Sequence, residues 1–349
     1  MTNHKKRERN MKILIDTYDT AFQNVSGGVR NRILSVVEAL KNAGVSVDYF
    51  NKYETNIRDY NILHVFMLKD DSYTLIKYAK ENGLKVVLSS IVTLSGKLQL
   101  RYYWWLRRLP IMTTYKLLFK ICNIVDTIIA ETDQEARFLE KYYHVSKDRI
   151  VVIPNGADRM STDSKMIYEA IGKICDYALE VGRFDKNKNQ LAVIKALKDT
   201  DIEMVFIGGE SSSEPEYYAE CLTAAGDCSN IHFLGWLDRE DKLLKSAYCN
   251  AKAIVSSSYN ETFGLTIIEG IMAGAIPVIS NTLPILDYES LKKCVTFSPS
   301  DENDIRRKIS EVMDSNDPYI VKNIKKKVMS EFSWEEVAKK HLEIYGVLQ

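Results

Sequence analysis

The sequence predicts a two-domain α/β protein in which each domain is built on a parallel sheet. Strand-like and helix-like runs alternate along almost the whole chain, which is typical of parallel sheets covered by helices. The length of 349 residues corresponds to about two domains. Residues 1–160 carry 25 Lys and Arg against 17 Asp and Glu, whereas residues 161–349 carry 22 against 30. This division of charge indicates two domains with different partners.

In the first half, short runs rich in β-branched residues alternate with longer amphipathic runs. The expected strands are residues 12–16, 45–50, 61–66, 84–89, 125–130 and 149–153. The expected helices are residues 29–42, 73–82, 98–122 and 134–143. Residues 1–10 are polar and basic, so we expect a basic tail and no secretory signal there.

The second half repeats the alternation. The expected strands are residues 177–181, 203–208, 231–234, 253–256, 276–279 and 295–297. The expected helices are residues 190–198, 216–225, 239–249, 265–273, 304–314 and 320–332. A last helix begins at Ser333, where Glu336 completes a capping box. We therefore expect domains over 11–160 and 161–332, and a C-terminal helix over 333–349 that packs back on the first domain.

Composition excludes several protein classes. The six cysteines are scattered without a Cys-x-x-Cys pair, which argues for buried thiols in a reducing compartment and against a zinc site. There is no uncharged apolar run of 18 residues that would span a membrane. Asp199-Thr-Asp201 precedes a strand at its amino end, the wrong side of a sheet for a ligand, so we expect no metal there. We expect a cytoplasmic protein, either soluble or peripheral on a membrane.

The most informative segment is residues 256–269, where a strand ends, a polar loop follows, and an apolar helix begins near Gly264. The backbone amides of Gly264, Leu265 and Thr266 would form an anion site at the start of this helix. Glu261 lies before the helix and Glu269 within it, so both carboxylates can line one cleft. Carboxylates are good acceptors for sugar hydroxyls.

This segment resembles the Glu-x7-Glu element of retaining glycosyltransferases of family 4, the group 1 glycosyltransferases with the GT-B fold. Four other segments resemble the family in the expected order, from the first glycine loop and the interdomain linker to the phosphate-binding turn and the strand before the base-binding loop. They are Ser26-Gly-Gly-Val29, Ile153-Pro-Asn-Gly-Ala-Asp158, Val181-Gly-Arg-Phe-Asp-Lys-Asn-Lys-Asn-Gln190 and Ile231-His-Phe-Leu-Gly-Trp236. The resemblance implies two Rossmann-like domains whose sheets face each other across a cleft.

The resemblance also implies the roles of individual residues. Arg183 and Lys188 would stabilise the negative charge that develops on the departing diphosphate, a task that suits two cations. Glu261 would meet the donor sugar, and Glu269 would accept hydrogen bonds from the ribose. Gly27 and Gly28 would let the backbone approach the diphosphate from the first domain, because glycine has no Cβ. Phe263, Gly264, Leu265 and Thr266 complete the expected donor site, without metal or cofactor.

One departure from the family concerns a histidine that many members carry just after the fourth strand. The corresponding region of this chain, residues 86–95, contains no histidine. We expect Ser89 or Ser90 to take a lesser hydrogen-bonding role on the acceptor side. His64, in the third strand, is expected to be a structural histidine rather than a catalytic one.

A second signal lies in residues 82–125, which contain seven Lys and Arg and no acid. A helix up to Leu109 would place Leu98, Tyr102 and Trp105 on an apolar face, with basic residues beside it and Pro110 interrupting. Such a basic aromatic helix suits an anionic lipid surface. We assign Arg101, Trp104, Trp105, Arg107 and Arg108 to the acceptor or membrane side. A core-facing helix and a nucleic-acid surface are the alternatives, and the latter lacks any recognised module.

Together these observations predict an enzyme that transfers a hexose from a nucleotide-diphosphate sugar to a saccharide hydroxyl with retention of configuration. Uridine is the expected base because it is frequent in the family. The acceptor is expected to be lipid-linked, in surface polysaccharide or glycoconjugate synthesis at the inner face of the membrane. The alternatives are a non-catalytic partner subunit of another glycosyltransferase and a soluble transferase that acts on a small molecule.

Overall fold

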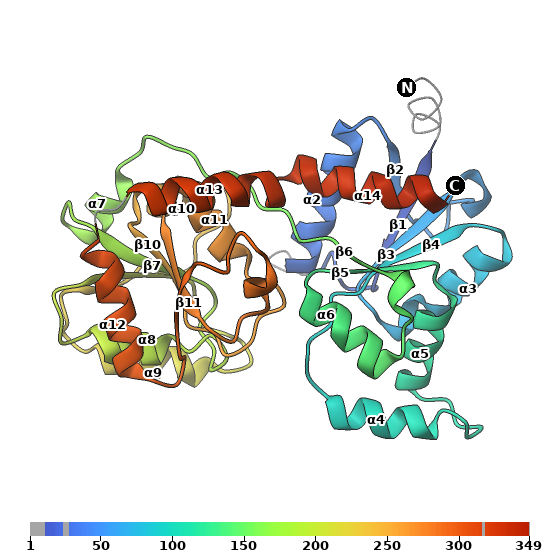
Figure 1. The fold of residues 1–349 in the computed structure, drawn as a ribbon, viewed down its shortest axis with the longest axis horizontal. Helices are drawn as coiled ribbons and strands as arrows, with labels where there is room; N and C mark the ends of the chain where they lie inside the picture. Colours follow the sequence, from blue (N-terminus) through green and yellow to red (C-terminus); the bar gives the residue numbers. More distant parts are fainter. Residues whose placement is uncertain (1–10, 24–27, 316–317, 349) are drawn as a thin grey trace. The chain divides into compact units, whose positions relative to one another are not determined.

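The computed structural model describes residues 11–23, 28–315 and 318–348, and the chain divides into two compact units (Figure 1). Unit 1 is the chain up to Gly156 together with the segment from Trp334 onward, and unit 2 is Ala157–Ser333. Within the described residues, each unit contains a six-stranded sheet whose paired strands are all parallel. The predicted α/β class with two parallel sheets is confirmed.

The sheet of unit 1 has the strand order β2-β1-β3-β4-β5-β6. Its strands are β1 (Lys12–Thr17), β2 (Ser46–Tyr49), β3 (Ile62–Phe66), β4 (Lys85–Ser89), β5 (Thr127–Ala130) and β6 (Ile150–Val152). Its helices are α2 (Gly28–Asn42), α3 (Tyr73–Glu81), α4 (Lys97–Leu106), α5 (Thr114–Ile124), α6 (Asp133–Phe138) and α14 (Trp334–Leu348). Every residue of β3 is buried, as expected for a central strand covered by helices on both faces.

Helix α14 is part of unit 1 although it comes last in the chain. Its buried residues Val337, Ala338 and Tyr345 pack in one apolar cluster with residues of α2 and β1. The Tyr345 hydroxyl lies 2.7 Å from His64 Nδ1, and His64 Nε2 lies 2.9 Å from Ser89 Oγ. Because His64 is fully buried, its pKa is held well below the ordinary value and the ring is neutral. His64 therefore fastens α14 to the sheet, which is the structural role predicted for it.

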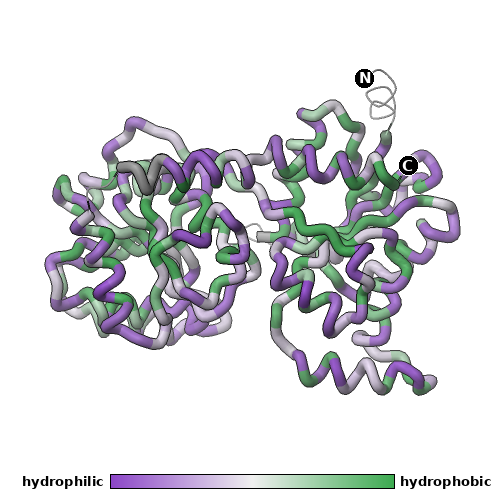
Figure 2. The backbone as a smooth tube through the Cα atoms, in the orientation of Figure 1, coloured by the Kyte–Doolittle hydropathy of each residue, from purple (hydrophilic) through white to green (hydrophobic). Residues whose placement is uncertain are grey.

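The sheet of unit 2 has the order β12-β11-β10-β7-β8-β9. Its strands are β7 (Tyr177–Val181), β8 (Glu203–Ile207), β9 (Ile231–Phe233), β10 (Ala253–Ser256), β11 (Ile276–Ser280) and β12 (Val295–Phe297). Its helices are α7 (Met166–Ile171), α8 (Gln190–Leu197), α9 (Pro215–Ala225), α10 (Lys242–Asn250), α11 (Leu265–Ala273), α12 (Glu302–Met313) and α13 (Pro318–Phe332). Figure 2 shows hydrophobic backbone stretches running through the strands of both sheets.

The two sheets share a topological feature that places ligands. In unit 1 the strand order reverses between β1 and β3, and in unit 2 it reverses between β7 and β10. The loops that leave the carboxyl ends of strands on either side of such a reversal separate and open a crevice, where ligands of these folds bind. Each unit therefore has one topologically favoured ligand position.

The helices differ from the expected ranges in two places. Residues 98–122 are not one continuous helix, because α4 ends at Leu106 and α5 begins at Thr114. Pro110, which was expected to interrupt this stretch and which lacks an N–H, lies in the break between them. Helix α7 was not predicted at all, since six residues are too few for a clear helical period. None of the helices in the described segments combines the length and apolar character needed to cross a bilayer.

Candidate active site in unit 2

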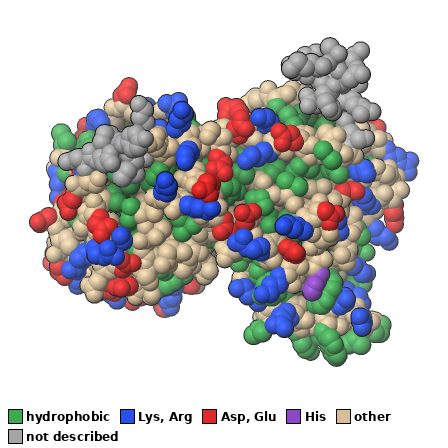
Figure 3. Space-filling model, viewed as in Figure 1, with side chains coloured by type: hydrophobic (Ala, Val, Ile, Leu, Met, Phe, Trp, Pro, Cys, Tyr) green, Lys and Arg blue, Asp and Glu red, His purple; other side chains and the backbone are tan. Residues whose placement is uncertain are grey.

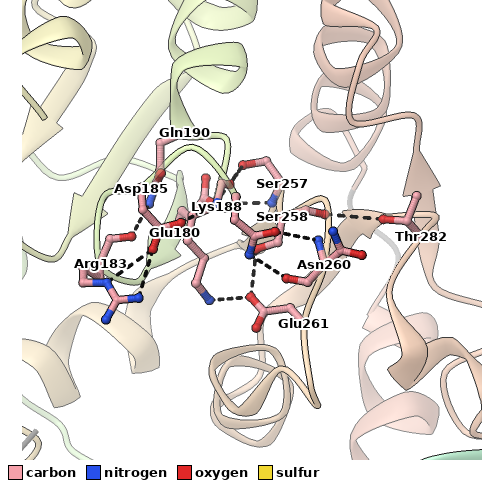
Figure 4. A network of polar contacts seen from close by, with 11 residues as sticks. Glu180, Arg183, Asp185, Lys188, Gln190, Ser257, Ser258, Asn260, Glu261 and Thr282 are labelled. Carbon is pink, nitrogen blue, oxygen red and sulfur yellow. Dashed lines mark hydrogen bonds and ion pairs between the residues drawn. The ribbon is translucent and has the colours of Figure 1, made fainter. Parts of the chain in front are cut away.

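The loop that follows β7 and the loop that follows β10 are joined directly by hydrogen bonds (Figure 4). The Tyr259 N–H donates to the Asn187 carbonyl at 2.8 Å. The Asn187 side chain donates to the Asn260 carbonyl at 2.8 Å and accepts from the Asn260 N–H at 3.1 Å. The crevice at the reversal of the sheet is thus lined by two loops of fixed relative position.

Lys188 and Glu261 form an ion pair between these loops. The Ser258 hydroxyl donates to the same Glu261 oxygen at 2.8 Å. Both charged side chains are largely buried, with exposed fractions of 25% for Lys188 and 14% for Glu261. The structure therefore places together two of the residues that the sequence predicted to act on the donor.

Arg183 lies beside this pair and is held by Asp185. Its Nη2 and Nε atoms lie 3.1 and 3.3 Å from Asp185 Oδ2, while Asp185 Oδ1 accepts from the Lys188 N–H at 3.0 Å. One carboxylate thus orients the guanidinium and the turn that carries Lys188. The Arg183 side chain as a whole is 58% exposed, so an anion can reach it. Asp185 was missed, although its place between the two predicted cations is a signal for such a role.

Glu180 is a second residue that sequence reasoning missed. It lies in β7, and its Oε1 accepts from the Ser257 N–H at 3.3 Å and lies 2.9 Å from the Ser257 hydroxyl. That hydroxyl is also 2.7 Å from the Lys188 carbonyl oxygen. Burial raises the pKa of Glu180 to about 7, although the hydrogen bonds from Ser257 oppose the shift. A glutamate within the apolar run of β7 is the signal that marks it.

The start of α11 is the place where the sequence predicted an anion site. The cap residue Gly264 has φ +100°, and no side chain of the described residues caps this helix end. The first-turn amides, including those of Leu265 and Thr266, are therefore left for an anion. The expectation that the Phe263 side chain belongs to the donor site is wrong, because this side chain is buried in the core against Tyr288 and Phe332. Only the backbone of Phe263 can serve the site.

Glu269 belongs to a separate polar group on α11. It accepts from the Tyr248 hydroxyl at 2.9 Å. Burial raises the pKa of Glu269 to about 7, while Tyr248 and Arg239 act in the opposite direction. Arg239 itself pairs with Asp158. Arg183, Lys188 and Glu261 thus form one cluster, and Glu269 is held by other partners.

The residues predicted for the acceptor side lie in unit 1, and not all of them are exposed. The Ser90 hydroxyl is fully buried and donates to Glu135 at 2.7 Å, and Ser89 is buried against His64. This corrects the expectation for both serines, because their hydroxyls are used inside the fold. Gly27 lies outside the described residues, and Gly28 is the first residue of α2.

In the basic aromatic segment, some side chains pack against other parts of unit 1 and others are exposed. Trp104 stacks on His144, and the Arg107 guanidinium lies 3.5 Å from the Trp104 ring centroid. Arg101, Trp105 and Arg108 are exposed, and their assignment to the acceptor or membrane side stays a prediction.

Asp199 and Asp201 lie in the turn before β8, at the amino end of the sheet. Among the residues that the structure describes, His, Cys, Asp and Glu form no group of three or more that could hold a metal ion.

Comparisons with known proteins identify the family. Residues 173–328 match the family of glycosyl transferases group 1, and residues 51–160 match glycosyltransferase family 4. An uncharacterized glycosyltransferase of Methanocaldococcus jannaschii, MJ1607, is 26% identical to this chain. The matched region covers 59% of this chain and 56% of the relative. The D-inositol 3-phosphate glycosyltransferase of Corynebacterium diphtheriae is 23% identical, over 73% of this chain and 74% of its own. The O-antigen chain mannosyltransferase C of Escherichia coli is 22% identical, over 87% and 89%.

Solved structures share the fold. HepE of Anabaena, solved with UDP and glucose, has a TM-score of 0.73 at 14% identity and covers 97% of this chain and 100% of its own. The sucrose-phosphate synthase of Thermosynechococcus elongatus has a TM-score of 0.74 at 17% identity and covers 97% and 99%. The motifs, the two sheets and both family matches lead to one conclusion: the chain belongs to the group 1, family 4 glycosyltransferases, with the GT-B fold.

Proposed function

We propose that this glycosyltransferase moves a hexose from a UDP-linked sugar to a hydroxyl of a lipid-linked saccharide, with retention of configuration and without a metal. The observation that carries the proposal is the cluster of Arg183, Lys188 and Glu261 at the strand reversal of unit 2. The choice of UDP is supported by HepE, a neighbour in fold that was solved with UDP and glucose.

The charges of the cluster suit a departing diphosphate. As the bond to the sugar breaks, negative charge grows on the leaving oxygen, and fixed cations that face it lower the barrier. Arg183 is exposed for a bidentate contact, and Lys188 supplies a point charge. Two side-chain cations do here what a divalent ion does in other nucleotide-sugar enzymes.

Glu261 and Glu269 are assigned to the two ends of the donor. Glu261 is assigned to a hydroxyl of the donor sugar because it shares the cluster with Lys188, and its contacts with Lys188 and Ser258 both use Oε1. Glu269, held by Tyr248, is assigned to the ribose hydroxyls. In the retaining reaction the acceptor attacks from the face that the diphosphate leaves, and a diphosphate oxygen takes the proton. No protein base is then required, which suits a chain without the family histidine.

The acceptor is proposed from the surface of unit 1. On α4 the side chains of Leu98, Tyr102 and Trp105 are 81%, 59% and 73% exposed, and the exposed Arg101 lies among them. Figure 3 shows hydrophobic side chains with Lys and Arg beside them over this part of unit 1. Such a mixture suits an anionic membrane surface at the inner face, where a lipid-linked saccharide is presented. The O-antigen mannosyltransferase among the relatives supports a polysaccharide product.

A panel of nucleotide-diphosphate sugars tests the donor side. Thermal shift and slow hydrolysis would be measured for the wild type, Arg183→Ala, Glu269→Ala and the matched control Lys186→Ala, an exposed lysine of the same turn. We expect one sugar nucleotide to stabilise the wild type and the control, to be hydrolysed by both, and to lose its effect in the other two variants. Binding without any turnover, even with membrane extract as acceptor, would favour a non-catalytic partner subunit instead.

Sedimentation with liposomes tests the membrane side. The wild type is expected to sediment with vesicles that contain anionic phosphatidylglycerol and to remain in solution with purely zwitterionic ones. Leu98→Ser combined with Trp105→Ser should abolish sedimentation, whereas Tyr53→Ser, which removes an aromatic ring that is 85% exposed elsewhere in unit 1, should not. If none of the three proteins sediments with anionic vesicles, a soluble transferase with a small acceptor is favoured; equal sedimentation of all three would show that α4 is not the membrane-binding surface.

A further inference from the structure

Glu180 of β7 is a buried carboxyl group next to the turn that carries Lys188 (Figure 4). Its Oε1 faces Ser257, from whose N–H it accepts at 3.3 Å. Its Oε2 is buried and has no hydrogen-bond partner among the described residues. An ionised carboxylate that lacks partners is costly in a protein interior, whereas the neutral acid loses much less. The surroundings of Glu180 therefore favour its protonated form.

Two short contacts of the Ser257 hydroxyl show where the proton of Glu180 lies. The Ser257 Oγ is 2.9 Å from Glu180 Oε1 and 2.7 Å from the Lys188 carbonyl oxygen. Oxygen atoms at these distances are joined by hydrogen bonds, each of which needs a hydrogen of its own. The Ser257 hydroxyl has one hydrogen and a carbonyl has none. Both bonds are made when a protonated Glu180 donates to Ser257 and Ser257 donates to the Lys188 carbonyl.

Loss of the proton from Glu180 breaks this arrangement. The ionised carboxylate can only accept, so the single hydrogen of Ser257 must serve one of two oxygens. A hydrogen bond to a charged acceptor is the stronger one, so the hydrogen turns to Glu180 and the Lys188 carbonyl loses it. That carbonyl belongs to the turn whose Lys188 N–H is held by Asp185 at 3.0 Å. Ionisation of Glu180 thus releases one of the contacts that fix the Lys188 backbone.

The groups around Glu180 place its ionisation in the neutral range. Burial is the largest effect and raises the pKa of Glu180 to about 7. The charge of Lys188 lowers this pKa and that of Glu261 raises it, and the two side chains are paired with each other. On α9, burial raises the pKa of Cys221 to about 12 and also raises that of Tyr217, so both of these neighbours are neutral.

We infer that Glu180 is a positioning residue that works as a neutral acid: through Ser257 it holds the Lys188 turn in place, and its ionisation weakens donor binding. The inference rests on the proposed function, because Lys188 matters here as a cation that faces the donor diphosphate. It adds to that function a control by pH. Since binding and protonation are linked, donor binding must also favour uptake of a proton by Glu180.

NMR titration of the protein without any ligand tests the hydrogen bonds. The Glu180 carboxyl resonance, found in a glutamate-labelled sample by its absence from Glu180→Gln, is expected to titrate at a pH of about 7. The ¹⁵N shift of Asn189 reports on its peptide partner, the Lys188 carbonyl, and should follow with the same midpoint. In Glu180→Gln, whose amide always donates to Ser257, the Asn189 shift should not depend on pH. A Glu180 that titrates at the ordinary pKa of glutamate, or an Asn189 shift that ignores it, would overturn the inference.

Calorimetric titration with UDP-glucose, whose diphosphate stays fully ionised in this range, tests the effect on the donor. For the wild type and the control Glu216→Gln, an exposed glutamate of α9, we expect a dissociation constant about fivefold higher at about pH 8.5 than at about pH 6, the effect of one hydrogen bond. Glu180→Gln should bind tightly at both pH values, and Ser257→Ala weakly at both.

Proton uptake, measured in buffers of different ionisation enthalpy, gives a second readout. Near pH 7 the wild type should take up more protons on binding than Glu180→Gln does. The difference between the two proteins is the relevant quantity, because the pKa of Glu269 is also raised to about 7 and this residue is present in both. Equal proton uptake by the two proteins would contradict the link between Glu180 and the donor.

Two further results separate this inference from the proposed function. Thermal unfolding curves would show that each variant is folded. If UDP-glucose binds Glu180→Gln with the same pH dependence as the wild type, or as weakly as Ser257→Ala, the role of Glu180 is wrong and the donor assignment stands. If neither UDP-glucose nor any other sugar nucleotide binds the wild type, the donor assignment fails, and the effect of Glu180 on the donor fails with it.

Discussion

The two strand reversals of this protein have the same topology but different chemistry. In unit 2 the loops are joined to each other by hydrogen bonds, and the charged side chains are paired as Lys188 with Glu261 and Arg183 with Asp185. In unit 1 the corresponding position is a cavity with aromatic rings and aspartates in its wall. The comparison teaches that the fold fixes where a ligand lies, whereas the loop residues decide which ligand it is. The first position carries paired charges between fixed loops, whereas the second is an open cavity of mixed aromatic and charged lining.

The largest expected effect comes from removing Lys188, one of the two cations in the cluster of unit 2. We expect Lys188→Ala to lower kcat/KM by about 10²–10³-fold, because a fixed donor to developing charge is lost and Glu261 is left without its ion pair. Kinetics with the donor identified by the sugar-nucleotide panel would measure this, with Lys186→Ala as control. An unchanged kcat/KM for Lys188→Ala would contradict the role assigned to this lysine.

The next largest effect, on stability, is expected at Gly208, the residue that directly follows β8 in unit 2. Gly208 has φ +151°, and a Cβ there would lie 1.9 Å from the Gly182 carbonyl oxygen, just before Arg183. We expect Gly208→Ala to lower the free energy of unfolding by about 3 kcal/mol, because the backbone itself must move. Urea unfolding would measure it. In unit 1, by contrast, Gly346 of α14 has open space around a Cβ, so Gly346→Ala should leave stability unchanged or slightly raised.

The buried carboxyl of β7 predicts a dependence on pH. The pKa of Glu180 is raised to about 7, so below that pH the folded state binds more protons than the unfolded state, whose Glu titrates near the ordinary value. The free energy of unfolding therefore falls as pH rises from about 5 to 8. Glu180→Gln should remove this term and gain about 2 kcal/mol relative to the wild type between those pH values. Denaturant curves at both pH values would test it, and a constant difference would contradict it.

The smallest effect is expected from the polar contact that fastens α14 in unit 1. Tyr345→Phe removes the hydroxyl that lies 2.7 Å from His64 Nδ1 and leaves a buried nitrogen without that partner. We expect a loss of about 1 kcal/mol in the free energy of unfolding. Chemical unfolding of this variant would measure it, and an unchanged midpoint would mean that the apolar contacts of α14 alone hold it. The donor site should be unaffected.

Much of this architecture was predictable because its signals are local. Parallel strands appear as short apolar runs, and all twelve expected runs coincide with strands of the two sheets to within a few residues. The cluster of Arg183, Lys188 and Glu261 was predictable because the loops that carry it follow strands that topology places side by side. The sequence could not show that Phe263 is a core residue while Glu261, two positions earlier, belongs to the cluster, because both lie in the same motif.

What the sequence alone could not decide depends on contacts between distant residues. The period of α4 shows which side chains share a face, but not that the Leu98 face stays uncovered while Leu100 is buried. Ser89 and Ser90 stand at a strand end, where hydroxyls often meet ligands, yet their partners His64 and Glu135 lie 25 and 45 residues away. A local sequence pattern does not predict hydrogen-bond partners that lie so far away in the chain.

The place of α14 in unit 1 has a consequence for biosynthesis. The chain leaves unit 1 at Gly156, whose missing Cβ makes room for the Trp334 ring where the chain returns. Unit 2 is one continuous segment, so it can fold while later residues are still being added to the chain. Unit 1 lacks the helix that packs with Ile13, Ile33 and Val36 until α14 has left the ribosome, after all of unit 2. Unit 1 is therefore begun before unit 2 and completed after it, and its apolar cluster at α2 and β1 stays uncovered in the meantime.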